Sequence, residues 1–406
     1  MMKHIVETLE TPVMDPVDVI VAGGGFAGVA AALAARRLGA SVLLLEKTAL
    51  LGGLGTNGLI SWYEPLCDGL GEQMITGLAE ELLRLSIRYG DNTLPQIWRD
   101  RSKPVDKSLV RPEKQHPVGG RYGTFFSPPM CQMAMDEILK QEGVQIRLDI
   151  TAARPVMENG HVTGVVCESV SGRQCFPATA FVDATGDADL FYRAGCPTVN
   201  GSNFLSVVAH FASLTEKKKP LEQRRWFFCG ADLHGGGHPE GYPYLSGTTN
   251  EEVTRFLLDG RKMLLDQMKA NKQGAGEIAT LPSQAQFRKT RRINGRKTLT
   301  EADLKVRHED SIALTSDFER VGDWYEIPYG CLIADGADNL FAAGRMISSE
   351  GWAWDVTRVI PDCALTGEVA GTAAAMIALE HLTTETLPLT ALQAQLQKQG
   401  VRLHRD

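Results

Sequence analysis

The chain has 406 residues, and at about 150 residues per domain this length predicts two domains or one domain with a large insertion. Hydrophobic residues make up 43% and charged residues 22%, values typical of globular proteins, which excludes disordered and fibrous classes. Lys and Arg number 42 against 49 Asp and Glu, so the net charge of −7 has the wrong sign for a nucleic-acid-binding protein.

Residues 1–16 lack a basic patch followed by an apolar run, so we expect a disordered lead-in and neither a secretory signal nor a transit peptide. The eight cysteines include no CxxC pair, which argues against a zinc site or a disulfide framework and favours reduced thiols in the cytoplasm. The uncharged stretch Val19–Ala35 is too short and too rich in glycine to predict a membrane span.

A strand, a glycine turn, a helix and a second strand follow in order. Asp18–Ala22 is a short apolar β-branched run, and Val29–Leu38 is an alanine-rich helical pattern. Gly39 stands where a helix C-cap needs glycine, and Ser41–Glu46 forms the second strand. The four segments predict a βαβ unit.

The turn within this unit has dinucleotide-binding spacing. A GxGxxG pattern lets the chain turn tightly and lets backbone N–H groups approach a pyrophosphate at the helix N-terminus. Glu46 lies near the offset at which an acid binds ribose hydroxyls, and a carboxylate there disfavours the 2′-phosphate of NADP. A buried βαβ unit with a glycine turn is the alternative. The expected binding residues of the turn are Gly23, Gly25, Phe26, Ala27 and Gly28.

A second glycine pair, Gly52 and Gly53, follows the acid within the segment Lys47–Gly58. Together with the first unit, this segment resembles the glutathione-reductase-like flavoproteins of the second type. More narrowly, it resembles the FAD-dependent oxidoreductase family related to fumarate reductase and succinate dehydrogenase flavoproteins. The resemblance implies FAD as the cofactor, with the glycine pair along its pyrophosphate and ribityl chain, and adds Lys47 and Thr56 to the expected binding residues.

Two later segments complete the site that the resemblance implies. Phe181–Asp189 reads as a strand ending in a turn, and Asn339–Arg345 as a strand running into a glycine. Pro361 opens a small-residue helix, Asp362–Leu379, whose N-terminus is implied to point at the flavin N1/C2 edge. An ordinary packing helix is the alternative. The cofactor-binding residues expected from these segments are Ala184, Thr185, Gly186, Gly344, Arg345, Thr366 and Gly367.

We therefore expect an α/β fold: a Rossmann-like FAD-binding domain of three ββα layers with a β-meander and an inserted mixed α+β substrate or cap domain. The FAD-binding domain is assigned to residues 15–60, 127–200 and 325–382, the cap to 61–126 and 201–324, and a helical tail to 383–406. Further helices are expected at 71–89, 130–142, 251–271 and 389–400, strands at 144–150 and 161–169, and a loop over the active site at 90–126.

The candidates for chemistry lie in the C-terminal block and the cap. Arg345 and Arg358 could hold a carboxylate or stabilise reduced flavin, or could form structural salt bridges. Arg292 could belong to a cationic patch for an anionic substrate or to a solvated surface. Trp354, with Trp352, could wall the substrate pocket or form a buried strand face.

Histidines and metals have weaker support. His210 and His308 are possible general acids or bases, although most single histidines are neither. The pair His234 and His238 is separated by three glycines and cannot form a helical ligand pair, so no metal is expected.

The expected function is FAD-dependent oxidoreduction by hydride transfer between flavin N5 and a small organic substrate, an anion or carboxylate being the favoured class. The chain has neither a second dinucleotide fingerprint nor a CxxxxC pair, so we expect an external electron donor or acceptor. The alternatives are an NAD-dependent dehydrogenase and a non-catalytic flavin-binding electron-transfer module.

Overall fold

The structure is a computed structural model, and it describes residues 5–90, 122–213, 224–270 and 276–405. Most of the expected loop over the active site therefore lies outside the described residues. Within the N-terminal segment, Met14 N donates to Cys175 O and Cys175 N donates to Pro12 O, so this part of the expected lead-in is bonded to the sheet.

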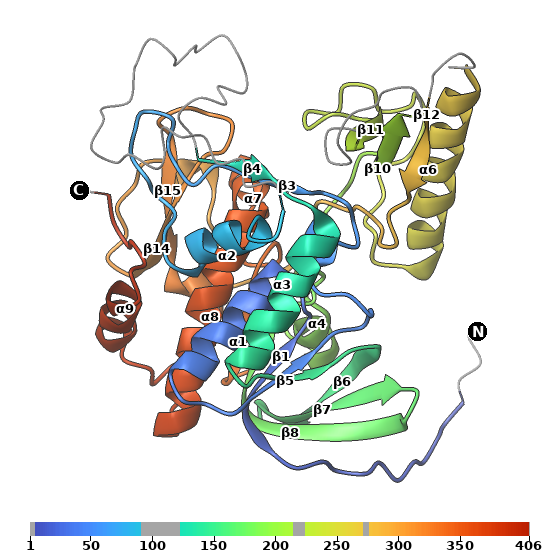
Figure 1. The fold of residues 1–406 in the computed structure, drawn as a ribbon. Coiled ribbons are helices and arrows are strands. Elements are labelled where there is room, and N and C mark those ends of the chain that lie inside the picture. The colour runs from blue at the N-terminus through green and yellow to red at the C-terminus, as the bar shows by residue number, and fades with distance from the viewer. Residues whose placement is uncertain (1–4, 91–121, 214–223, 271–275, 406) are drawn as a thin grey trace.

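A parallel sheet forms the centre of the larger part of the fold (Figure 1). Its strand order is β5-β2-β1-β8, with β16 paired to the other edge of β8. β1, β2, β16 and the end of β8 are buried, as their β-branched and leucine-rich sequences indicate, whereas the edge strand β5 is largely exposed. Their bounds are β1 Val17–Ala22, β2 Val42–Leu45, β5 Gln145–Arg147, β8 Gly172–Asp183 and β16 Leu340–Ala342.

An antiparallel β-meander adjoins this sheet, which confirms the meander predicted from the sequence. It comprises β6 (Ile150–Glu158), β7 (His161–Ser169) and the first half of β8. The strand expected at 144–150 is two strands, because Asp149 has a left-handed φ of 54° and breaks the extended run.

Helices form the third layer. The first, α1 (Phe26–Arg37), packs against α8 (Ile360–Glu380), and α2 (Leu78–Ser86) and α3 (Pro128–Gln141) lie beside them. Gly367 permits the close approach of α8 to α1, since a Cβ there would lie 2.1 Å from Ala27 O. By length and hydropathy α8 could span a bilayer, but 83% of its apolar window is buried inside the fold, so it is a core helix.

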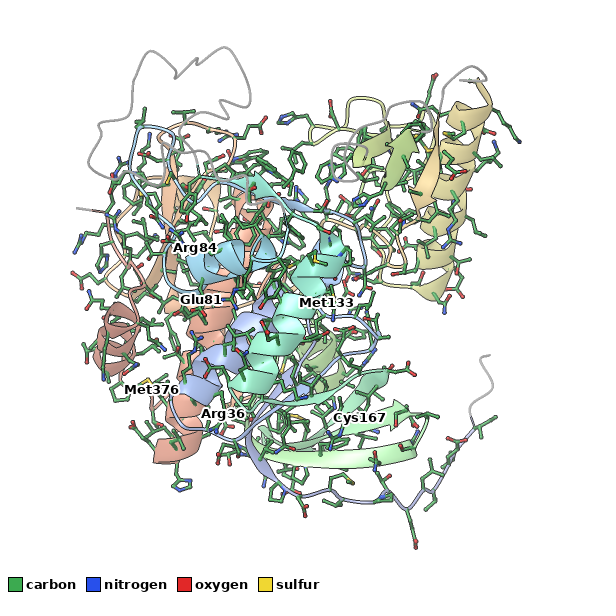
Figure 2. The ribbon with its side chains drawn as sticks, in the orientation of Figure 1. Arg36, Glu81, Arg84, Met133, Cys167 and Met376 are labelled. Atoms are coloured by element: carbon green, nitrogen blue, oxygen red, sulfur yellow. The ribbon has the colours of Figure 1, made fainter. Side chains whose placement is uncertain are left out.

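The expected helix at 71–89 is shorter than predicted. Gly71 and Gly77 have φ values of 107° and 69°, outside the helical region, so α2 begins only at Leu78. Glu81 and Arg84 lie on its exposed face (Figure 2).

A smaller antiparallel sheet of order β11-β10-β12 stands apart from the main sheet, with α6 packed on it. The domain limits assigned from the sequence remain a prediction. The elements of this part are β10 Ser206–Ser213, β11 Arg224–Gly230, α6 Asn250–Ala270 and β12 Gly276–Thr280. The remaining elements are β3 Trp62–Tyr63, β4 Thr124–Phe125, α4 Asp189–Ala194, β9 Thr198–Asn200, β13 Arg291–Ile293, β14 Ser311–Ser316, β15 Trp324–Pro328, α7 Gly351–Thr357 and α9 Leu389–Lys398, with short 3-10 turns at Gly53–Gly55, Glu301–Asp303 and Tyr329–Cys331.

Candidate functional site

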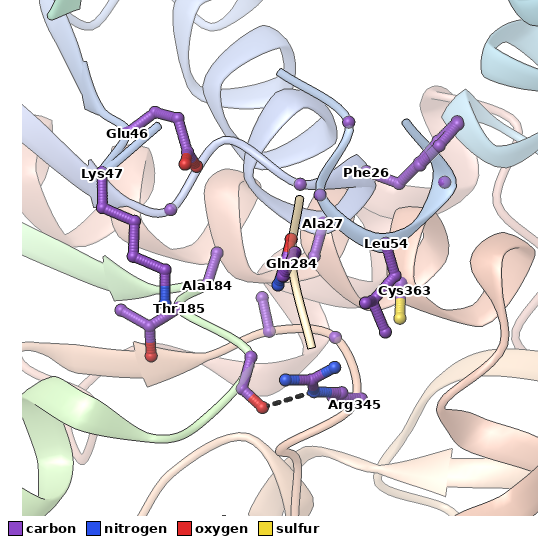
Figure 3. Close-up of a pocket in the computed structure, with 18 of the residues that line it drawn as sticks. Phe26, Ala27, Glu46, Lys47, Leu54, Ala184, Thr185, Gln284, Arg345 and Cys363 are labelled. Carbon is purple, nitrogen blue, oxygen red and sulfur yellow. Dashed lines mark hydrogen bonds between the residues drawn. The ribbon is translucent and has the colours of Figure 1, made fainter. Parts of the chain in front are cut away.

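A pocket opens where the parallel strands end and the two glycine turns meet (Figure 3). It encloses about 960 Å³ of space that no protein atom fills, including the part that opens to solvent. Fourteen of the residues singled out from the sequence line it: Gly23, Gly25, Phe26, Ala27, Glu46, Lys47, Gly52, Gly53, Ala184, Thr185, Gly186, Gly344, Arg345 and Arg358.

The glycines of the first turn have different roles. Gly23 has a φ of +105°, and a Cβ on Gly28 would lie 1.7 Å from Gly23 O, so both are needed for the turn and for packing of α1. A Cβ on Gly25 would meet only Gly53 Cα, at 4.0 Å. Gly25 therefore faces open space between the two glycine turns, at the N-terminus of α1.

Glu46 is 6% exposed and holds the turn in place. Its Oε2 accepts a hydrogen bond from Gly24 N at 2.7 Å, and its Oε1 accepts from Thr48 N and Oγ1 at 2.8 Å. Each oxygen of a carboxylate can accept more than one bond, so contact with ribose hydroxyls stays a prediction.

Arg345 joins three segments of the pocket wall. Its Nε donates to Gly186 O at 2.6 Å, Nη1 to Phe287 O at 2.9 Å and Nη2 to Asp187 Oδ1 at 2.7 Å. Burial opposes ionisation of Asp187, but the charges of Arg345 and Lys47 outweigh it and lower the pKa of that carboxyl. This geometry is the structural salt bridge that the sequence left open as the alternative role of Arg345.

Arg358 is differently placed. Its Nε donates to Asp355 Oδ1 at 3.0 Å, while Nη1 and Nη2 have no hydrogen-bond partner among the described residues. Asp355 Oδ2 also accepts from Lys289 Nζ at 2.6 Å. One carboxylate thus serves two cations beside the pocket.

A second cavity, of about 580 Å³ by the same measure, adjoins this ion-pair group. Arg288, in its wall, donates from Nη1 to Asp232 O at 2.8 Å. Burial and the like charge of Arg358 lower the pKa of Arg288 to about 10. The cavity is lined by Ser202, Asn203, Phe204, Leu233, Tyr244, Arg288, Lys289 and Asp355.

Four expected cofactor-binding residues lie outside the pocket lining. Gly28 and Gly367 pack helices, as described above. Thr366 Oγ1 accepts from Gly344 N at 3.0 Å, and the Thr56 hydroxyl donates to Leu51 O. The structure therefore places all four behind the wall, where they support residues that line the pocket.

Two of the catalytic candidates also lie outside the lining. Arg292 Nη2 pairs with Glu350 Oε2 at 3.1 Å, and its side chain is 5% exposed, so it is not part of a solvated surface. Trp354 is buried on helix α7, and its Nε1 donates to Arg345 O at 2.6 Å. The strand face considered for the tryptophans is wrong, because residues 351–357 are helical.

The histidine candidates lie away from the pocket. His210 is 5% exposed and its Nε2 lies 3.3 Å from both Ser61 Oγ and Leu59 O. His308 lies 3.2 Å from Asp303 Oδ1. His234 Nε2 lies 2.9 Å from Glu319 Oε1, and no group of three potential metal ligands occurs in the part of the chain that the structure describes.

Helix α8 begins at the pocket. Ile360 and Cys363, from its first turn, line the wall beside Arg358. The unpaired N–H groups of a helix N-terminus carry positive partial charge, which favours an electron-rich group in the pocket.

Several lining residues were not singled out from the sequence. Gln284 reaches the pocket from the smaller part of the fold, and Arg288 and Asp355 line the adjoining cavity. Arg288 belongs to the basic stretch RKTRR at 288–292, and only the fold shows which of its cations face a cavity.

A family model described as FAD dependent oxidoreductase matches residues 18–229 and 237–396. The chain belongs to this family. It is an FAD-dependent enzyme, so neither an NAD-dependent dehydrogenase nor a non-catalytic module describes it. A search of curated protein sequences finds no match.

Several solved structures are similar to this chain at low sequence identity. A structure titled as a study of BexE and oxidation during BE-7585A biosynthesis has a TM-score of 0.50 and 13% identity over 95% of this chain and 69% of that chain. The OxyS anhydrotetracycline hydroxylase from Streptomyces rimosus has a TM-score of 0.46 and 12% identity over 95% of this chain, which spans 66% of that protein. A flavocytochrome c3 fumarate reductase has a TM-score of 0.40 and 16% identity over 91% of this chain and 79% of its own.

The residues of the pocket fit FAD. The open space over Gly25 is a cradle that a larger side chain would fill, and it lies at a helix N-terminus suited to a diphosphate. Lys47, near the acid, adds positive charge at the rim. The remaining wall runs from Ala184–Gly186 to Arg345 and the start of α8, and the rest of the cofactor would lie along it.

Proposed function

We propose that the enzyme transfers a hydride between flavin N5 and a small organic anion held beside Arg358. The observation that carries this proposal is the excess of cations at the junction of the two cavities. Arg358 and Lys289 both bond to the carboxylate of Asp355, and the charges of Asp355 and Asp232 act on the third cation, Arg288.

An anionic substrate would relieve this imbalance. The pKa of Arg288 is lowered to about 10 because burial and Arg358 both disfavour its charge. A carboxylate placed between the two guanidinium groups would accept charge-assisted hydrogen bonds from the free Nη atoms of Arg358. These bonds would orient the substrate carbon toward the pocket, which is the protein's part in a cofactor-driven reaction.

The adjoining cavity supports a planar substrate body. Phe204 and Tyr244 line it, with ring centroids 5.5 Å apart, and Tyr244 stacks on His238 at 4.9 Å. Aromatic walls beside cations suit an aromatic or unsaturated carboxylate. The reacting end of the substrate would then lie at the cofactor in the first cavity, and its aromatic or unsaturated body would lie in the second cavity.

The other residues bind and orient the cofactor in this proposal. The two glycine turns hold the diphosphate, Glu46 the ribose, and the first turn of α8 stabilises negative charge on the ring. Bound FAD supplies the two-electron acceptor or donor. The proposal keeps an external electron donor or acceptor and a cytoplasmic location, which the eight free thiols support.

The test is an anaerobic screen of small carboxylates, each matched with its amide or primary alcohol, against the FAD-loaded enzyme. Bleaching of the flavin band by carboxylates, but not by their neutral counterparts, is the expected result. If the enzyme is photochemically reduced instead, reoxidation by an unsaturated carboxylate reports the reverse direction. Equal reaction with neutral and anionic members of each pair would contradict the proposed substrate class.

A further inference from the structure

Three buried carboxylate oxygens near the pocket have no hydrogen-bond partner among the described residues: Glu64 Oε2, Asp362 Oδ1 and Asp362 Oδ2. Asp362 is fully buried. A buried carboxylate without a hydrogen-bond donor is strongly disfavoured, whereas a protonated carboxyl is not. The burial alone therefore indicates that this group holds a proton.

The two residues lie directly behind the pocket wall. Glu64 follows strand β3, and Asp362 is the third residue of helix α8. The carboxyl of Glu64 faces the N–H of Ile360 and the charge of Arg358, and both of those residues line the pocket. Glu64 therefore lies on the same positive helix end that the cofactor ring is proposed to use.

The electrostatic environment of the two carboxyl groups also favours their protonated forms. Burial raises the pKa of Glu64 to about 7, although backbone N–H groups and Arg358 partly offset the rise. Burial also raises the pKa of Asp362 well above its ordinary range, and Glu64 adds to that rise. The Thr315 hydroxyl, which donates to Ser316 O, opposes this rise in pKa but does not outweigh the burial. The other titratable groups that act on the pair are Tyr63, Cys363 and Asp317.

We propose that Glu64 and Asp362 form a proton-holding pair, and that Glu64 gains a proton when negative charge is placed in the pocket. An ionised Glu64 offsets the positive charges of Arg358 and of the α8 N-terminus. A protonated Glu64 leaves both charges to the pocket. The protonation state of Glu64 thus sets how much positive charge faces the pocket. This proposal rests on the placement of the flavin ring in this pocket.

Reduction of the cofactor is coupled to protonation of Glu64 in this proposal. When a reduced reference dye gives two electrons to the bound cofactor, one extra proton from solvent forms an O–H bond with the Glu64 carboxylate. Below about pH 7 Glu64 already carries that proton, so there is no extra uptake. Above this pH, each unit changes the two-electron reduction equilibrium by up to a further tenfold, or about 30 mV.

The experiment measures the midpoint potential of the FAD-loaded protein from about pH 5.5 to about pH 8.5. Wild type should show a steeper fall above about pH 7, and Glu64→Gln should lose this extra slope. Glu368→Gln is the matched control, because burial raises the pKa of Glu368 to about 7 as well, but Glu368 does not line the pocket and accepts from Leu78 N. The control should keep the wild-type slope, and equal slopes in wild type and Glu64→Gln would overturn the proposal.

A second measurement needs no variant. The reduced-minus-oxidised infrared difference spectrum of wild type near pH 8 should contain a protonated carboxyl band that shifts in deuterium oxide. The absence of such a band would also overturn the proposal. A protein that does not take up FAD would instead contradict the cofactor site, so the two failures are distinguishable.

Discussion

Arg345 Nη2 donates to Asp187 Oδ1 at 2.7 Å, which ties the segment after β16 to the loop after β8. The same guanidinium donates to Gly186 O and Phe287 O, so it links its own segment to the loop after β8 and to the segment that contains Phe287. We interpret Arg345 as a residue that shapes the pocket, and Arg358 as the one with donors available to a substrate.

Replacing Arg345 tests this interpretation. Arg345→Gln would leave Asp187 with the Thr290 hydroxyl at 2.6 Å and with Lys47 as a cation 3.9 Å away, and should lower the free energy of unfolding by about 3 kcal/mol because it breaks a largely buried pair. Denaturant unfolding measures the change. Arg37→Gln, at half-exposed pairs with Glu81 and Glu142, should cost about 1 kcal/mol or less. Equal losses of unfolding free energy in the two variants would contradict the stabilising role of the Arg345–Asp187 pair.

A substitution at Gly25 should prevent cofactor binding without preventing folding. A Cβ at Gly25 meets no protein atom closer than 4.0 Å, so Gly25→Val should fold with a circular dichroism spectrum like wild type yet purify without FAD. Gly28→Val should instead destabilise the fold, since even its Cβ would lie 1.7 Å from Gly23 O. A yellow Gly25→Val protein would contradict the placement of the diphosphate.

The cations beside the pocket should control the affinity for anions. Arg358→Gln is expected to weaken binding of a carboxylate substrate by about 1.5–3 kcal/mol, or roughly tenfold to a hundredfold, with retention of FAD. Arg288→Gln should show a smaller loss in the same direction. Arg255→Gln, on the exposed side of α6, is the control and should leave binding unchanged. Binding titrations followed by flavin absorbance measure all three, and unchanged binding in Arg358→Gln would rule out its proposed role.

Glu368 gives a pH dependence of stability whose sign can be derived. Burial raises the pKa of its carboxyl to about 7 in the fold, above the unfolded value of about 4.3. The folded state therefore binds the proton more tightly, and this stabilising contribution is present below the unfolded pKa and is lost as pH rises to about 7.

Glu368→Gln should remove this loss of stability at higher pH, because a glutamine side chain does not titrate. Its unfolding free energy relative to wild type should rise by up to about 3 kcal/mol between about pH 4.5 and about pH 7.5. Glutamine can still accept from Leu78 N, which limits other effects. Denaturant unfolding across this range checks the trend, and a pH-independent difference would count against the raised pKa.

The sequence alone predicted the parts of the fold whose signals are local. The βαβ unit is visible because strand, glycines, helix and acid follow within 30 residues of one another, and α8 because small residues continue for several turns. The meander at 161–169 was predicted from alternation alone.

Other features depend on contacts between distant segments. Glu64 has no distinguishing pattern around it, and its meaning depends on the start of α8, about 300 residues later. The cavity role of Arg288 depends on Arg358 in the same way. Trp352 and Trp354, spaced by one residue, suggested a strand face, yet the segment is helical and Trp354 bonds to Arg345 O. Tertiary contacts decided each of these, and local periodicity does not record them.

The most direct test of the central claim is the FAD content of the purified protein, measured as flavin released by heat denaturation and compared with the protein concentration. The account predicts an equimolar amount in wild type and close to none in Gly25→Val. Wild-type protein that stays colourless after incubation with excess FAD would contradict it.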